Sequence, residues 1–316
     1  MNRNIASFPT NVLRNFSFLI DYPPAASNAV PEQDMPTPND VNLTFNRRPW
    51  RLGARPLVMG ILNVTPDSFS DGGDCADPDT AVARGLAMAA AGADLLDVGG
   101  ESTRPGSRAV PAGEEAARVV PVIRELARRL TIPISVDTTK AAVAAAALDA
   151  GAVLLNSVRP LHEEPELLEL LRTCDAGAVL MHLRGTPQTM QSQTHYDNVV
   201  EEILGFFDHG LRVLAAAGIA PERIILDPGL GFAKTAEQNL ELIRALGRFR
   251  ALGRPVLAGP SRKSFIGKLL DEPDPKRRQW GTAAAVAACV LHGADILRVH
   301  DVPEMIQVCR VAAACR

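Results

Sequence analysis

Eight short apolar segments recur along the chain, each followed by a polar turn and a stretch with helical spacing. Short apolar segments bounded by turn residues are typical of buried parallel strands. The predicted strands are Leu57–Leu62, Leu95–Val98, Pro133–Val136, Ala152–Leu155, Gly177–Met181, Arg223–Leu226, Pro255–Ala258 and Asp295–Val299. The predicted helices are Pro78–Ala91, Glu114–Leu130, Thr139–Ala150, Pro165–Thr173, Asn198–Ala217, Ala236–Leu246, Gly281–His292 and Val302–Ala314. This alternation indicates an α/β fold, a (β/α)8 TIM barrel, with a doubly wound open sheet as the alternative.

A small-residue turn is repeated before several of the predicted strands. Its glycine is Gly92, Gly151, Gly177 or Gly293, and an alanine follows each time. Because glycine directly after the last helical residue ends a helix, these four positions are predicted helix stops. The repetition supports a strand–helix unit that recurs along one domain.

Residues 1–50 differ from the rest of the chain. The segment Asp21–Asp40 is rich in Pro, Ala, Ser and Asn and has no apolar period. Such a composition is typical of linkers that cannot bury enough apolar surface to fold. We therefore predict an irregular, flexible N-terminal extension over residues 1–50 and a single barrel domain over residues 51–316.

Charge and composition argue against several classes of partner. The net charge is −3 and aromatic residues make up 4% of the chain, which disfavours nucleic-acid binding. No apolar run reaches the roughly 18 residues that span a bilayer, so no membrane partner is expected. The five cysteines form no CxxC pair, which fits free thiols in a reducing cytoplasm.

Polar residues stand at the end of nearly every predicted strand. In a TIM barrel these ends form one rim, where active sites lie. Asp137, Asn156 and Asp227 offer oxygen acceptors that suit a ligand rich in N–H donors, such as an aminopyrimidinone edge. The rim residues in chain order are Asn63, Asp97, Asp137, Asn156, Met181, His182, Asp227, the loop Gly259–Ser264, Arg298 and His300.

Cationic residues after the seventh and eighth predicted strands indicate an anion site. The segment Pro260–Ser264 places Arg262 and Lys263 at a helix start, and Arg298 and His300 lie two apart so that they face one side. Lys263 also admits the interpretation of a Schiff-base lysine, but its polar neighbours favour a solvated, charged lysine.

Other polar residues carry weaker signals. Lys140 and Lys234 look like ordinary lysines of loops or helix starts. His182, His195 and His209 show no metal-ligand spacing.

Seven motifs in series resemble those of the dihydropteroate synthases, a family of pterin-binding enzymes of the folate pathway. The resemblance covers about residues 57–305. The motifs are Gly60–Gly73, Asp97–Gly106, Ser135–Thr138, Met181–Gln191, Asp227–Phe232, Gly259–Ser264 and Arg298–Val302. One such motif would be a weak signal, whereas seven in the same order leave little room for coincidence.

The resemblance implies an enzyme that joins 4-aminobenzoate to (7,8-dihydropterin-6-yl)methyl diphosphate and releases diphosphate and 7,8-dihydropteroate by a dissociative mechanism. It implies Mg²⁺ held with the help of Asn63, and a homodimer formed through helices late in the barrel. The implied catalytic residues are Asp137, Asp71, Thr103, Arg104 and Lys263. The implied substrate-binding residues are Thr103, Asp137, Asn156, Met181, Asp227, Phe232, Gly259, Lys263, Ser264, Arg298, Val299 and His300.

Within this resemblance, Asp137, Asn156, Asp227 and Lys263 line the pterin pocket, and Arg298 and His300 grip the diphosphate. Phe232 and Ser264 border the 4-aminobenzoate position. The loops with Asp71 and with Thr103–Arg104 close over the substrates.

Two positions depart from the family pattern: Ser157 stands where the family usually has Asp, and Ala233 stands where it has Gly. If Ala233 needs a positive φ, the substitution costs about 1 kcal/mol. The alternative functions are a pterin-dependent methyltransferase and a non-catalytic pterin-binding paralogue.

Overall fold

The computed structural model describes residues 42–52, 55–65, 77–102, 109–186 and 188–316. All of them belong to one compact unit, Pro36–Arg316. Its strands are β1 (Asn42–Phe45), β2 (Arg48–Arg51), β3 (Leu57–Asn63), β4 (Leu95–Gly99), β5 (Ile134–Asp137), β6 (Leu154–Ser157), β7 (Gly177–Met181), β8 (Ile224–Asp227), β9 (Leu257–Ala258) and β10 (Ile296–Val299). Its helices are α1 (Pro78–Ala90), α2 (Ala112–Arg129), α3 (Ala141–Asp149), α4 (Pro165–Thr173), α5 (Val199–Ala216), α6 (Ala236–Arg244), α7 (Leu246–Arg250), α8 (Ser264–Leu270), α9 (Gln279–Leu291) and α10 (Val302–Ala314).

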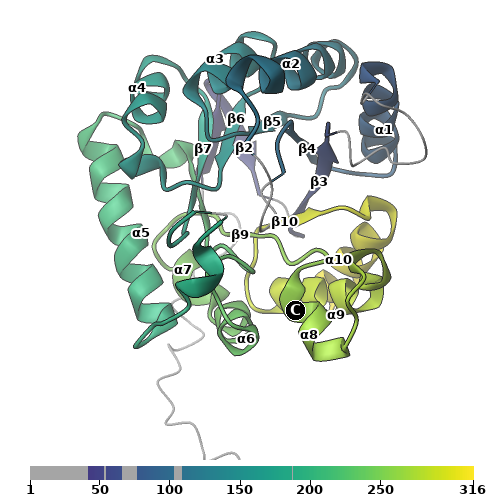
Figure 1. The fold of residues 1–316 in the computed structure, drawn as a ribbon, viewed down its shortest axis with the longest axis vertical. Helices are drawn as coiled ribbons and strands as arrows, with labels where there is room; N and C mark the ends of the chain where they lie inside the picture. The colour runs from purple at the N-terminus through teal and green to yellow at the C-terminus, as the bar shows by residue number, and fades with distance from the viewer. Residues whose placement is uncertain (1–41, 53–54, 66–76, 103–108, 187) are drawn as a thin grey trace, which may run out of the picture. The chain divides into compact units, whose positions relative to one another are not determined.

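Strands β3 to β10 form one parallel sheet in the order β8-β7-β6-β5-β4-β3-β10-β9. Leu226 of β8 bridges Val256, which directly precedes β9, so the two edges of the sheet meet. Figure 1 shows these strands at the centre with the helices in a ring outside them. The predicted (β/α)8 barrel is confirmed.

Strand β9 is shorter than predicted, and its start has a local cause. Pro255 has no N–H to donate, and the Val256 N–H donates to the Asp295 carboxylate at 3.0 Å instead of to a neighbouring strand. The predicted helix 236–246 is likewise divided into α6 and α7 around Ala245. Neither change alters the order of the units.

Side chains alternate across each strand and separate two apolar layers. Outward residues such as Leu96, Val136 and Leu297 pack under the helices in the main core. Inward residues such as Met59, Leu154 and Ile225 fill the barrel nearer the amino ends of its strands. The inward positions nearer the carboxyl ends are therefore left for polar side chains.

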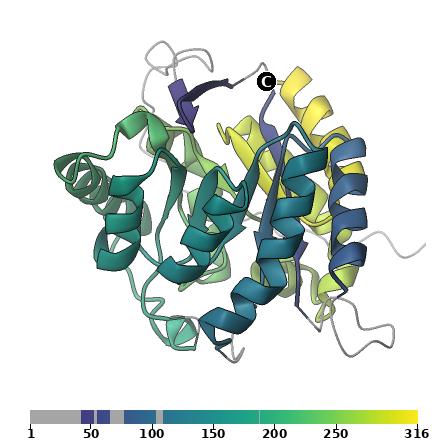
Figure 2. The same ribbon diagram turned by 90° about the horizontal axis from the view of Figure 1, so that it is seen from above.

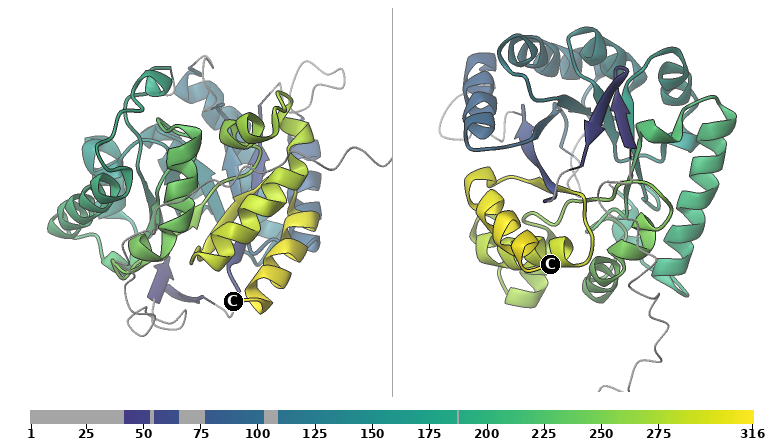
Figure 3. Two further views of the ribbon diagram at one scale, coloured as in Figure 1. Left: turned by 90° about the horizontal axis from the view of Figure 1, so that it is seen from below. Right: turned by 180° about the vertical axis from the view of Figure 1, so that it is seen from behind.

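A hairpin of β1 and β2 closes the amino-terminal end of the barrel, across which it lies in Figures 2 and 3. Asn46 and Arg47 both have positive φ, as a tight two-residue hairpin turn requires. Leu43 and Phe45 are buried with the inward residues of the barrel. These residues fall within the range predicted as an irregular extension, and for them that prediction is wrong. Residues 1–41 lie outside the described residues.

The repeated glycine turns differ in role. Gly92, Gly151 and Gly293 have φ between +102° and +116° and end their helices as predicted. Gly177 is instead the first residue of β7, so its prediction as a helix stop is wrong. A Cβ there would lie 2.2 Å from Cδ1 of Phe45, so glycine is required by the packing of the hairpin.

Gly177→Ala is expected to lower the free energy of unfolding by about 1–3 kcal/mol, the usual cost of overpacking a dense core. Thermal or urea unfolding measures the change. Gly205→Ala is the matched control, because nothing lies within 4 Å of a Cβ at this position of α5. Equal stability of the Gly177→Ala chain and the unaltered chain would contradict the packing described.

Among the described residues, no helix is both long and apolar enough to cross a membrane.

Candidate active site

A pocket opens at the carboxyl-terminal rim of the barrel. The inward alternation of the strands delivers most of its polar groups from β5, β6, β8 and β10. Its lining residues are Asp137, Asn156, Val158, Met181, Asp227, Leu230, Phe232, Gly259, Lys263 and Arg298. The structure therefore brings together residues from five separate sequence motifs and Asn156, which was predicted from the end of its strand.

Arg298 joins two carboxylates beneath the pocket. Its Nε donates to Asp97 Oδ2 at 2.6 Å, and its terminal nitrogen donates to Asp137 Oδ2 at 2.7 Å. Asp97 also accepts from Asn156 Nδ2 at 2.8 Å and is fully buried. Because an ionised carboxylate only accepts, this bond fixes which end of the Asn156 amide faces Asp97.

Asp97 is thus a site residue whose role the sequence did not reveal. It appeared only as one of the polar strand ends and as part of a motif. The alternation of side chains along β4 could have predicted that Asp97 points into the barrel, because Leu95, two residues earlier, does so. The hydrogen-bond partners of Asp97 lie on β6 and β10, so the sequence of β4 could not identify them.

Asp227 is held by the turn that follows β8. The Gly229 N–H donates to Asp227 Oδ1 at 2.7 Å. Gly229 has φ +68°, and a Cβ there would lie 2.2 Å from the His182 carbonyl oxygen. Only glycine adopts this positive φ without strain, and only glycine leaves room for the His182 carbonyl oxygen. Burial raises the pKa of the Asp227 carboxyl, and the Gly229 N–H and Lys263 oppose this rise.

Lys263 lies over the ring of Phe232, with Nζ 3.8 Å from the ring centroid. Its stem passes Gly231, where a Cβ would lie 2.8 Å from Lys263 Cδ. The expectation of a solvated lysine is therefore wrong, because the side chain is partly buried along the pocket wall. Burial, assisted by the charge of Arg298, lowers the pKa of Lys263 to about 7.

Three carboxylates lie at or beneath the pocket. Asp97 and Asp137 pair with the guanidinium of Arg298, and Asp227 interacts with the ammonium groups of Lys263 and Lys234. Burial raises the pKa of Asp137 to about 7, against the opposing charge of Arg298. Such a site favours a ligand that supplies N–H donors or gains positive charge.

The predicted anion corner is only partly assembled as expected. Ser261 Oγ lies 2.9 Å from His300 Nδ1 and accepts from the His300 backbone N–H. The guanidinium of Arg262 pairs with Asp301 instead of facing the pocket, which corrects its predicted place beside Lys263. Arg298 is engaged by Asp97 and Asp137, as described above.

The remaining predicted residues have diverse positions. Met181 and Gly259 line the pocket, and Ser264 is exposed at the first position of α8. The side chain of Val299 is fully buried in the outer core, so it does not face the pocket. Asp71, Thr103 and Arg104 lie outside the described residues.

The two departures from the family pattern have local explanations. Ala233 adopts φ +51°, so the condition for its strain is met. Ser157 is buried, and its Oγ accepts from the Arg159 N–H at 3.2 Å, which stabilises the turn after β6. Neither side chain lines the pocket.

Comparison with known proteins also indicates a pterin-binding enzyme. A family model described as pterin binding enzyme matches residues 59–300. Dihydropteroate synthase of Synechocystis sp. is 52% identical over 262 residues, which are 83% of this chain and 91% of the relative. The enzyme of the same name from Escherichia coli is 44% identical over 261 residues, 83% of this chain and 92% of that protein.

Solved structures agree with this result. Xanthomonas albilineans dihydropteroate synthase with 4-aminobenzoic acid has a TM-score of 0.81 at 44% identity, covering 87% of this chain and 98% of that chain. The Burkholderia cenocepacia enzyme complexed with 7,8-dihydropteroate has a TM-score of 0.78 at 42% identity, covering 87% and 96%.

The TIM barrel, with acidic and amide side chains around one pocket at its rim, defines a pterin-binding enzyme. The chain is also 42–52% identical to dihydropteroate synthases over most of its length, which specifies the family within this class. The chain belongs to the dihydropteroate synthase family.

Proposed function

We propose that the chain joins 4-aminobenzoate to (7,8-dihydropterin-6-yl)methyl diphosphate, giving 7,8-dihydropteroate and diphosphate. The observation that carries this proposal is the convergence of Asp137, Asn156, Asp227 and Lys263 on one pocket. Three oxygen acceptors and one cationic donor complement the N–H groups and the carbonyl of an aminopyrimidinone ring. The relatives crystallised with 4-aminobenzoic acid and 7,8-dihydropteroate support the choice of ligands.

The reaction proposed is dissociative. The bond between the pterin methylene carbon and the diphosphate oxygen breaks first, and the electron pair leaves with the diphosphate. The amine of 4-aminobenzoate then attacks the pterin cation and afterwards loses a proton. The negative charge of Asp137 stabilises this cation, and Asp227 holds the pterin ring by accepting from its N–H groups.

Asn63 suits the proposed role at a magnesium site. It is the last residue of β3, and its Oδ1 would lie 3.8 Å from a Cβ at Gly99, beside Asp137 on the rim. Mg²⁺ is usually held by one or two protein oxygens together with substrate phosphates and water, so a single amide oxygen fits. The ion would neutralise charge on the departing diphosphate. Among the described residues, no cluster of three or more His, Cys, Asp or Glu could hold a metal.

The remaining assignments extend this proposal. His300 and Arg298 contact the diphosphate, Phe232 and Ser264 border 4-aminobenzoate, and the loops with Asp71 and with Thr103–Arg104 close over both substrates. The four described free cysteines support a cytoplasmic location.

Release of diphosphate tests the proposed function directly. A coupled pyrophosphatase assay is run with the dihydropterin diphosphate, with and without 4-aminobenzoate. We expect dihydropteroate and diphosphate in equal amounts, and only when both substrates and Mg²⁺ are present. Pterin binding without diphosphate release would support the non-catalytic alternative, and methyl transfer from a methyl-pterin would support the methyltransferase.

We further propose that two chains pair through α8, α9 and α10. Trp280 is 84% exposed at the start of α9, and Leu270 and Val311 on the neighbouring helices are more than half exposed. Figure 1 shows these three helices grouped on one side of the barrel. Large apolar side chains clustered on adjacent helices are typical of a protein interface.

Trp280→Glu is expected to convert the dimer into a monomer at micromolar concentration, because a charge would replace the most exposed aromatic side chain at this face. Light scattering after size exclusion measures the mass. Ala142→Glu at an exposed position of α3, outside the proposed interface, is a control for the added charge. A monomeric unaltered chain, or a dimeric Trp280→Glu chain, would refute the proposed interface.

A further inference from the structure

Lys234 lies behind the pocket wall with only 4% of its surface exposed. The sequence predicts an ordinary lysine of a loop or helix start, and the structure corrects this interpretation. Its Nζ lies 2.9 Å from the Phe232 carbonyl oxygen, 3.1 Å from that of Gly229 and 3.2 Å from His182 Nδ1. An ammonium group has three N–H donors. Three acceptors therefore match the three donors of one buried cation.

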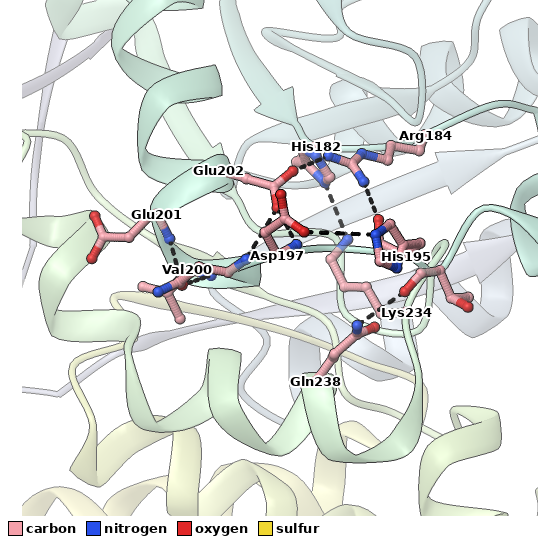
Figure 4. Close-up of polar contacts among 11 residues, drawn as sticks. His182, Arg184, His195, Asp197, Val200, Glu201, Glu202, Lys234 and Gln238 are labelled. Atoms are coloured by element: carbon pink, nitrogen blue, oxygen red, sulfur yellow. Dashed lines mark hydrogen bonds and ion pairs between the residues drawn. The ribbon is translucent and has the colours of Figure 1, made fainter. Parts of the chain in front are cut away.

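His182 is a fixed acceptor for this cation. Burial, together with the charges of Lys234 and Arg184, lowers the pKa of His182 to about 2, so the ring is neutral. Because Nδ1 accepts from Lys234, the ring proton is placed on Nε2. The ring packs edge-on against Phe206 at 4.9 Å, and Figure 4 shows it facing Lys234 beside Arg184.

The turn that Lys234 contacts carries two pocket groups. The Phe232 N–H donates to the Gly229 carbonyl oxygen at 3.1 Å and closes the turn. At its start the Gly229 N–H donates to the Asp227 carboxylate. At its end the ring of Phe232 receives the ammonium of Lys263. A displacement of this turn would therefore move the Asp227 contact and the Phe232 ring together.

Packing alone does not account for a cation at this position. Burial lowers the pKa of Lys234 to about 7; Asp227 opposes this fall, whereas Lys263 and Arg184 add to it. Burying an ammonium carries a large desolvation cost, and an apolar side chain of similar volume often stabilises a fold as well or better. Lys234 donates to two carbonyl oxygens of the turn 229–232 and to His182 outside that turn. These bonds fix where the turn lies relative to His182.

We propose that Lys234 is a positioning residue that ties the turn 229–232 to His182 and thereby sets the places of Asp227 and Phe232 in the pocket. This inference rests on the proposed function for its kinetic readout. Lys234 does not line the pocket, so it does not touch the substrate. Its loss therefore affects substrate binding more than the bond-breaking step.

The first test is Lys234→Met, which keeps an unbranched side chain, one atom shorter, and removes all three donors. We expect KM for the pterin substrate to rise by about tenfold or more, the loss typical of hydrogen bonds to a charged group, while kcat falls less than about threefold. Lys268→Met on the exposed side of α8 is the matched control and should leave both constants unchanged. Unchanged KM in a folded Lys234→Met chain would overturn the proposal.

The second test distinguishes a cation from mere volume. Lys234→Ala removes three carbons and the ammonium, a space that n-propylammonium matches, whereas n-propanol has a similar size without the charge. We expect millimolar propylammonium to lower the raised KM of Lys234→Ala severalfold and propanol to have no effect. Equal rescue by both, or rescue by neither, would overturn the proposal.

Two further outcomes are decisive. If neither Lys234 variant folds while Lys268→Met does, Lys234 is a residue of stability and the positioning proposal is rejected. If the unaltered chain makes no dihydropteroate, the proposed function fails, and calorimetric binding of 6-hydroxymethylpterin replaces KM as the readout. A tenfold loss of that binding in Lys234→Met would still support positioning, and equal binding would refute it.

Discussion

Asp137→Asn is expected to lower kcat by about 100- to 1000-fold while weakening pterin binding by less than about tenfold. The asparagine keeps the shape of the side chain and an oxygen that accepts from Arg298. It removes one of the two carboxylate charges that pair with Arg298, and Asp97 keeps the other. Because positive charge develops on the pterin only as diphosphate departs, this charge matters more in the transition state than in the bound substrate.

The pH dependence of turnover follows from the same carboxyl. Burial raises the pKa of Asp137 to about 7, so the group is protonated below that pH and ionised above it. kcat of the unaltered chain should therefore fall as pH decreases through about 7. The Asp137→Asn chain has no carboxyl to protonate at this position, so its kcat should not show the decrease that protonation of Asp137 causes.

Steady-state rates and calorimetry separate the two effects. Asp94→Asn is the matched control, since Asp94 also pairs with an arginine, Arg55, but directly before the amino end of β4. It should change stability and leave turnover near that of the unaltered chain. Equal losses of turnover and of pterin affinity in Asp137→Asn would contradict the assigned role.

Lys263→Met is expected to weaken pterin binding by about 10- to 100-fold, the range of a lost hydrogen bond to a charged group. The methionine fills the channel beside Gly231 but removes the ammonium of Lys263, which interacts with both Asp137 and Asp227. The two carboxylates lose part of their charge compensation, and the ligand loses the lysine donor that lines the pocket.

Calorimetric titration with a dihydropterin measures this change. Lys268→Met serves again as control, because it removes an exposed lysine from the same helix. Thermal unfolding is measured in parallel, since relief from burying a charge can stabilise the Lys263→Met chain even as binding is lost. Binding within twofold of the unaltered chain would show that Lys263 does not contact the pterin.

Several residues show how far sequence reasoning reaches. Asp137, Asn156 and Asp227 were predicted as one set because each ends a strand, and parallel strands end at one rim. Asp97 satisfied the same rule, yet its buried contacts with Asn156 and Arg298 depend on strands far away in the chain. Lys234 looked like an ordinary lysine and Lys263 like a solvated one because their sequence neighbours do not reveal the contacts of Lys234 with His182 and of Lys263 with Phe232.

The sequence by itself determined the order of strands and helices, the rim residues and the family, because apolar period, turn chemistry and motif order are local properties. The tertiary structure alone decided that Phe45 packs against Gly177, that Arg298 is shared by two carboxylates, and that Lys234 contacts His182 behind the pocket. Each of these contacts joins segments that lie far apart in the chain and that the fold brings together. Their energies depend on burial and on exact partners, which no local pattern encodes.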